Sequence, residues 1–214
     1  MVDELELLKK DWQKKEAHLP KLSYDQIYKM IWKKSSSIVK WIFYISLLEF
    51  VFWAGLNIFF SDSESIQELK AMHIYQIIFV LNLVNYGIIL YFIYKFYTNY
   101  RKISFTDSSK KLMKTILDVK RTVTQYVWFN LIIFTIYMVI NIYGALVYSP
   151  EGAKIIEAAS QNGNSTYFWV MLIAISIGFI AIFLALIWLF YKLLYGILLK
   201  RLKQNYSELR KLEV

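Results

Sequence analysis

The chain has 214 residues, 57% of them hydrophobic, with 25 Lys and Arg against 16 Asp and Glu and a formal net charge of +9 at pH 7. The sequence contains no cysteine, which excludes disulfides, thiolate metal sites and thiol nucleophiles. The apolar residues are clumped rather than spread with the period of a soluble domain, so composition excludes an ordinary soluble protein and indicates an integral membrane protein.

Residues 1–37 are expected to form cytoplasmic N-terminal helices. In "DELELLKKDWQKKEAHLP" acids precede bases, the order that a helix dipole favours, and Pro20 marks the end of the helix. The next helix begins at "SYDQ", where Ser23 and Gln26 form a capping box, and continues through the serines at 35–37 into the first span. Ile27, Met30, Ile31 and Lys34 continue one stripe along this helix.

Four stretches are apolar enough, and long enough, to cross a bilayer, which takes about 20 residues. The predicted spans are about 38–60, 74–96, 123–148 and 167–191. Aromatic residues collect near the span ends, as in interfacial belts. The sequence therefore predicts an all-α protein whose transmembrane domain, 38–199, is an integral membrane four-helix bundle with cytoplasmic helical extensions.

Two basic segments follow spans and carry apolar stripes. Residues 97–122 are expected to form a cytoplasmic helical loop, and 200–214 a basic cytoplasmic C-terminal tail. The stripes have heptad-like spacing and consist of Leu112, Ile116, Val119 and Val123, and of Tyr195, Leu198, Leu202 and Leu209. They favour helices that extend beyond the bilayer and pack together. The alternative is basic amphipathic helices that lie flat on the inner leaflet.

The sign of the charge alternates along the chain. Segments 1–37, 96–122 and the tail after Phe190 are net positive, whereas 61–73 and 149–165 are net negative. Segments rich in Lys and Arg stay in the cytoplasm, so we expect a multi-pass protein of the bacterial inner membrane with both termini cytoplasmic. Most of the basicity follows from this topology and from attraction to the lipid bilayer, and no nucleic-acid partner is expected.

Glu49 is the one acid inside the predicted spans, and at helical rise it lies about 16 Å from the cytoplasmic surface, near the midplane. The predicted intramembrane polar cluster is Glu49, Asn82, Asn85, Asn130, Asn141 and Ser176. Polar side chains in lipid need partners, so these should face the bundle interior. Glu49 is then either a neutral structural acid bonded to an Asn, Tyr or Thr, or a site for protons, cations or substrate.

Catalytic signatures are absent from the sequence. There is no HExxH, no GxSxG and no Gly-rich phosphate loop. The two histidines, His18 and His73, are expected on opposite sides of the membrane, where they cannot share a metal. We expect no catalytic residues, no metal site and no cofactor.

The stretch 4–50, and most specifically "IYKM…KKSSSIVKWI" at 27–42, resembles small four-span inner-membrane proteins of flavobacteria and other Bacteroidota. The resemblance extends over the whole chain to a largely uncharacterised family. Many members are named beta-carotene 15,15'-monooxygenase, which implies a carotenoid oxygenase that holds iron through a set of histidines.

Three functions are therefore considered. The leading hypothesis is a non-enzymatic regulatory or scaffolding protein of the inner membrane that binds a protein partner through its cytoplasmic helices. The second is a small transporter or channel subunit that uses Glu49. The third is the carotenoid oxygenase that the resemblance implies. Homo-oligomerisation is left open.

Overall fold

The computed structural model describes residues 6, 8–10, 23–60, 63–71, 74–104, 108–161 and 165–212. In this part of the chain there are helices and no strands, which confirms the all-α prediction. The helices are α2 (Tyr24–Phe60), α3 (Ser63–Ala71), α4 (Tyr75–Ser104), α5 (Ser109–Tyr148), α6 (Pro150–Gln161), α7 (Ser165–Leu194) and α8 (Gly196–Leu212). Most of the helix expected before Pro20 lies outside the described residues.

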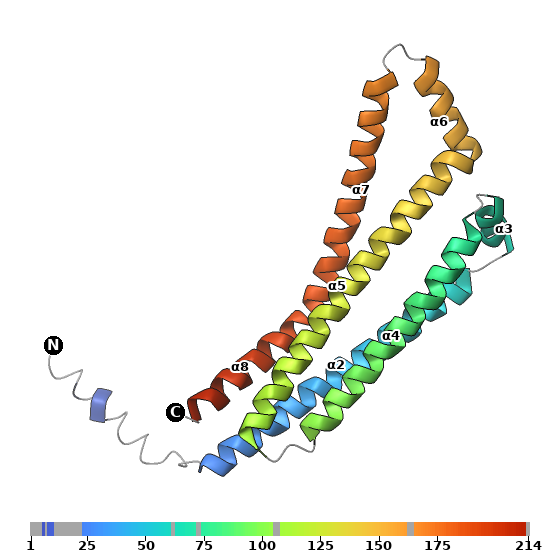
Figure 1. Cartoon of the computed structure of the whole chain (residues 1–214). Coiled ribbons are helices and arrows are strands. Elements are labelled where there is room, and N and C mark those ends of the chain that lie inside the picture. The colour runs from blue at the N-terminus through green and yellow to red at the C-terminus, as the bar shows by residue number, and fades with distance from the viewer. Residues whose placement is uncertain are drawn as a thin grey trace.

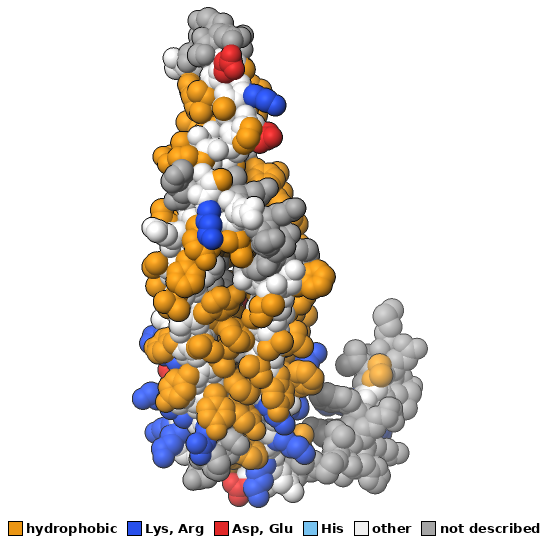
Figure 2. Space-filling model, turned by 90° about the vertical axis from the view of Figure 1, so that its right-hand side faces the viewer, with side chains coloured by type: hydrophobic (Ala, Val, Ile, Leu, Met, Phe, Trp, Pro, Cys, Tyr) orange, Lys and Arg blue, Asp and Glu red, His pale blue; other side chains and the backbone are white. Residues whose placement is uncertain are grey.

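Four of these helices, α2, α4, α5 and α7, are long and apolar enough to cross a membrane, which is compatible with a multi-pass membrane protein. Their apolar side chains face outward: in the most apolar window of α7, 0% of the residues are buried. Figure 2 shows hydrophobic side chains over much of the length of one face. An exposed apolar surface of this extent fits hydrocarbon better than water.

The long helices extend well past the thickness of a bilayer. α2 has 37 residues and α5 has 40, whereas about 20 cross the hydrocarbon core. α2 runs without a break through the three serines at 35–37, as predicted. The capping box is also confirmed, because Ser23 Oγ accepts from Gln26 N at 3.3 Å and Ser23 N donates to Gln26 Oε1 at 2.9 Å.

The protein core lies at one end of the molecule, where α2, α4, α5 and α8 converge (Figure 1). The predicted stripes form much of this core: Leu112, Val119 and Leu209 are each 0% exposed and Leu202 is 1% exposed. This burial confirms helices that pack against one another and argues against isolated helices lying flat on a membrane. At the other end α7 diverges from α5, and α6 links the two (Figure 1).

The stripe that begins the first long helix is buried only in part. Met30, at 49% exposure, and Lys34 are exposed, whereas Ile31 and Ser35 are buried. The helix is rotated toward its serines because α8 packs there, and Asn205 Nδ2 donates a hydrogen bond of 2.9 Å to Ser35 Oγ. A buried polar pair thus fixes the register between α2 and α8.

Two further hydrogen bonds join helices at this end of the molecule. Trp32 Nε1 on α2 donates to the backbone oxygen of Ile103 on α4 at 2.8 Å. Asn99 Nδ2 on α4 donates to Thr122 Oγ1 on α5 at 3.2 Å. Side-chain hydrogen bonds therefore join α2 to α4 and α4 to α5 at this end.

Candidate functional site

Glu49 lies on α2, is 5% exposed and accepts hydrogen bonds at both carboxyl oxygens. Tyr191 Oη donates to Oε1 at 2.5 Å, and Tyr195 Oη donates to Oε2 at 3.0 Å. The two tyrosines are four residues apart, so they lie on the same side of the helical segment at the junction of α7 and α8. The sequence predicted an Asn, Tyr or Thr as the partner of this acid, and in the structure both hydrogen-bond partners are tyrosines.

An aromatic cage closes around this carboxyl group. Tyr126 on α5 is 1% exposed and makes edge contacts with four rings, at centroid distances of 5.4 to 6.2 Å. These rings belong to Phe92, Phe96, Tyr191 and Tyr195. The cage shields the acid from water, and a shielded acid is tolerated only when it is hydrogen-bonded, as Glu49 is.

A cavity of about 320 Å³ adjoins the cage and is lined by α2, α4, α5 and α7. Its polar lining residues are Asn57, Asn82, Asn85, Asn130, Tyr86, Tyr126, Tyr137 and Tyr191. The rest of the lining is apolar or aromatic, including Phe50 and Trp53. Because Tyr126 and Tyr191 belong to both features, the cavity and the Glu49 cage share a wall.

The polar groups of the cavity differ in how well they are satisfied. Asn82 Oδ1 accepts from Tyr137 Oη at 2.6 Å, and Asn130 Nδ2 donates to the backbone oxygen of Tyr126 at 2.8 Å. Asn85 Oδ1 is buried and accepts no hydrogen bond from any residue that the structure describes. The wall of the cavity therefore combines amide side chains, one of them with an unpaired oxygen, with apolar and aromatic side chains.

The structure brings together only part of the predicted polar cluster. Asn82, Asn85 and Asn130 line the cavity, and Glu49 adjoins it through Tyr191. The remaining two residues bond within their own helices.

Asn141 and Ser176 lie apart from the cavity lining. Asn141 is exposed and donates through Nδ2 to the backbone oxygen of Tyr137 at 2.8 Å. Ser176 Oγ donates to the backbone oxygen of Leu172 at 2.9 Å. A bond to the carbonyl four residues earlier satisfies a polar side chain without a partner on another helix, and Asn141, being exposed, does not face the interior as expected.

Sequence reasoning missed the tyrosines as site residues. Tyr195 was expected to be buried as part of an apolar stripe, but the hydroxyls of Tyr191 and Tyr195 were not assigned to Glu49. The available signal was the i, i+4 spacing of two tyrosines at the end of the last span, which places both hydroxyls on one face.

Among the described residues, no group of three or more His, Cys, Asp or Glu side chains is placed so that it could hold a metal ion. His18 and His73 lie outside those residues. The predicted absence of a metal site stays a prediction.

Residues 25–214 match the model of a protein family described as a domain of unknown function, DUF8845. No curated protein and no solved structure matches the chain. The match covers the stretch 27–42, on which the sequence resemblance mainly depends, and it assigns no activity and no organism.

Proposed function

We propose a function for this chain, which belongs to the DUF8845 family, from the geometry of its interior: it binds a small solute in the cavity beside Glu49. The observation that carries the proposal is a cavity of about 320 Å³ lined by Asn85, whose side-chain oxygen is buried and has no hydrogen-bond partner among the described residues. An unpaired polar group within membrane-spanning helices lowers stability, so its presence favours a ligand-binding role. Apolar walls with a few convergent polar groups are also typical of small-molecule sites.

The chemistry of the lining narrows the class of solute. Its asparagines carry no fixed charge, and the adjoining carboxyl of Glu49 is already bonded to two hydroxyls. A solute with one or more hydrogen-bond donors and a compact apolar body would complement both parts of the lining. The site lies within the membrane-crossing helices, so the role that fits it is that of a small transporter or a transport subunit.

Replacing Asn85 by leucine is expected to weaken solute binding without destabilising the protein. Leucine deletes an unpaired polar atom, and such a change is neutral or stabilising, whereas loss of the acceptor should weaken binding of a donor-bearing solute by about tenfold or more. The measurement is the solute-induced rise in melting temperature in detergent micelles, screened over a panel of small amines, alcohols and amides.

Asn141→Leu is the matched control for this experiment, because Asn141 is the same residue type, lies within a membrane-crossing helix and does not line the cavity. It should keep the full solute-induced shift. If Asn85→Leu lowers the melting temperature or leaves the shift unchanged, Asn85 is not the ligand acceptor and the proposed site is wrong.

Binding of a protein partner is the second candidate, and one observation supports it. The apolar stripes are buried against each other, so they are not available to a partner, but the outer face of α8 is exposed and basic. Its exposed cations are Lys200, Arg201, Lys203, Arg210 and Lys211. A partner with an acidic surface would fit this face.

For localisation we propose the bacterial inner membrane, with both termini and residues 97–122 in the cytoplasm. α8, the start of α2 and the junction of α4 with α5 lie at the same end of the molecule (Figure 1). Most of the Lys and Arg visible in Figure 2 gather at that end. Lys and Arg concentrate on the cytoplasmic side, so this arrangement supports the proposed orientation.

A pair of reporter fusions tests the orientation. We expect a fusion after Val214 to report the cytoplasm and a fusion within α6 to report the opposite compartment, because α6 lies at the far end of the molecule from α8. Each site is fused in turn to alkaline phosphatase, which is active only outside the cytoplasm, and to green fluorescent protein, which is fluorescent only inside it. The same compartment at both sites would contradict the topology.

A further inference from the structure

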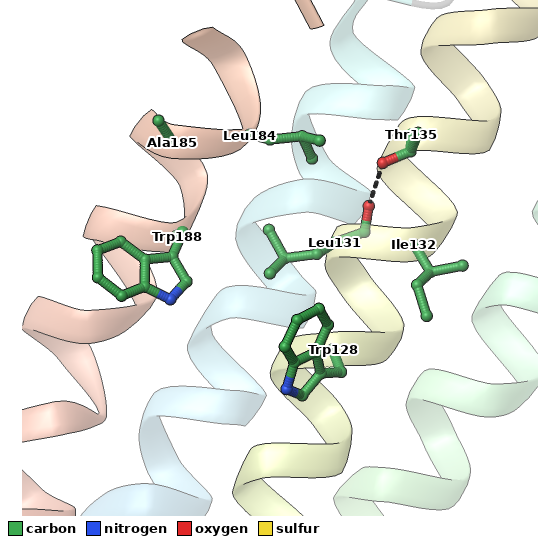
Figure 3. Close-up of a pocket in the computed structure, with 7 residues that line it drawn as sticks. All are labelled: Trp128, Leu131, Ile132, Thr135, Leu184, Ala185 and Trp188. Carbon is green, nitrogen blue, oxygen red and sulfur yellow. Dashed lines mark hydrogen bonds between the residues drawn. The ribbon is translucent and has the colours of Figure 1, made fainter. Parts of the chain in front are cut away.

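A hollow of about 350 Å³ separates α5 from α7 on a different face of α5 from the Asn-lined cavity. Trp128 on α5 and Trp188 on α7 are among the residues that line this hollow (Figure 3). The other lining residues are aliphatic apart from Thr135, whose hydroxyl is bonded to the backbone oxygen of Leu131 at 2.8 Å. The hollow therefore presents an almost wholly apolar surface.

A second hollow, of about 210 Å³, continues from the first toward α8. Trp128 and Trp188 line both hollows, so the two meet at the tryptophan pair and form one groove. The α8 end of this groove is polar, because Thr124 and Lys192 are among its lining residues.

Positive charge concentrates at the α8 end of the groove. Lys192 is exposed, and its Nζ lies 4.6 Å from the ring centroid of Trp188. Lys120 and Arg121, both exposed, precede Thr124 by about one helical turn and so lie on its side of α5. No acidic residue lines either hollow within the described part of the chain.

We propose that this groove binds one anionic phospholipid, with the headgroup phosphate at Lys192 and an acyl chain between Trp128 and Trp188. Charge complementarity assigns the occupant: a phosphate fits the cationic end, and a hydrocarbon chain fits the apolar end. The order of these features along α7 also matches a membrane interface, where Trp and Lys mark the boundary between hydrocarbon and headgroups.

The lipid contacts the outer side of the Glu49 cage. Tyr191 and Tyr195 line the α8 end of the groove, and their hydroxyls bind the carboxyl of Glu49. A lipid in the groove packs against these rings and fills the space between α5 and α7. Its binding therefore stabilises the native state through mass action.

The test uses the full chain in neutral detergent micelles. Melting temperature and native mass spectrometry are followed during titration with dioleoyl phosphatidylglycerol, with dioleoyl phosphatidylcholine and with glycerol phosphate. We expect one retained phosphatidylglycerol per chain and a rise in melting temperature, about tenfold weaker binding of phosphatidylcholine, and no effect of glycerol phosphate.

Variants locate the site. Lys192→Gln is expected to weaken phosphatidylglycerol binding about fivefold. Trp188→Phe should lower the affinity for both lipids, because the smaller ring leaves less apolar surface in contact with the acyl chain. Lys40→Gln is the matched control: Lys40 is exposed and lies 5.5 Å from the ring centroid of Tyr44, but it lines neither hollow, so its replacement should leave binding unchanged.

Three results would overturn the proposal. The first is equal weakening by Lys40→Gln and Lys192→Gln, which would indicate a diffuse surface charge. The second is equal affinity for the two phospholipids. The third is a dimer that forms as lipid is removed and is broken by Trp188→Phe, which would show that a second copy of the chain occupies the groove.

Discussion

Replacing Tyr126 by alanine is expected to destabilise the protein by about 3–5 kcal/mol, as measured by denaturant unfolding in detergent micelles. Tyr126 is the centre of the aromatic cage, is 1% exposed and makes edge contacts with four rings. Its removal opens a space among α4, α5 and the α7–α8 junction, and each edge contact contributes beyond the area it buries. The Glu49 carboxyl also loses its shield from water.

Tyr143→Ala is the control, because Tyr143 lies on the same helix and is 56% exposed. It should change stability by about 0.5 kcal/mol or less in micelles. Tyr126→Phe keeps the ring and should retain most of the stability. Equal losses for Tyr126→Ala and Tyr143→Ala would show that the cage is not the packing centre of the four long helices.

The helices and their packing stripes could be predicted because they depend on period and hydropathy alone. Leu112, Val119, Leu202 and Leu209 were assigned to the interior from heptad-like spacing, and all are buried. Local chemistry also sufficed for the capping box that begins α2. These features are encoded within one or two helical turns, so they need no knowledge of what packs against them.

The rotation of each helix could not be predicted in the same way. The sequence favours Met30 over Ser35 as an inward position, because Met is apolar, yet Ser35 is buried beside Asn205 of α8. Likewise, Asn85 and Asn141 have the same side chain, but Asn85 lines the cavity and Asn141 is exposed. Only the packing of α4 and α5 determines this difference. A pairing between residues 170 positions apart is a property of the tertiary structure.

The partner of Glu49 is a further case in which sequence was insufficient. The predicted depth of each residue in the bilayer places Glu49 near the midplane and several asparagines at a similar level. The chain has 17 tyrosines, however, and their predicted depth does not show which of them bind Glu49. Tyr191 and Tyr195 are selected because α8 packs against α2, which brings the α7–α8 junction over Glu49. The candidate cavity follows from the same packing and has no sequence signature of its own.

Replacing Glu49 by leucine is expected to destabilise the protein by about 2–3 kcal/mol. Leucine removes the acceptor for two buried hydroxyls, Tyr191 Oη and Tyr195 Oη, and leaves both unpaired inside the aromatic cage. An interhelical hydrogen bond in a membrane protein is worth about 0.6 to 2 kcal/mol, and a buried donor left unpaired costs about 1–3 kcal/mol. Unfolding in micelles measures the loss, and the double replacement Tyr191→Phe with Tyr195→Phe should recover most of it in the leucine background.

Glu49→Gln separates the structural role of this acid from an ionisable one. The amide oxygen accepts from one tyrosine, and the amide nitrogen donates to the hydroxyl oxygen of the other, so stability should fall by about 1 kcal/mol or less. The solute-induced thermal shift should persist, because the asparagines of the cavity are unchanged. Solute uptake into proteoliposomes decides the remaining question. Uptake that survives in Glu49→Gln makes Glu49 a structural acid, which is the result we expect from its two hydroxyl partners. Uptake that is lost while the fold and the thermal shift are intact would contradict that expectation and assign to Glu49 the proton or cation that drives transport.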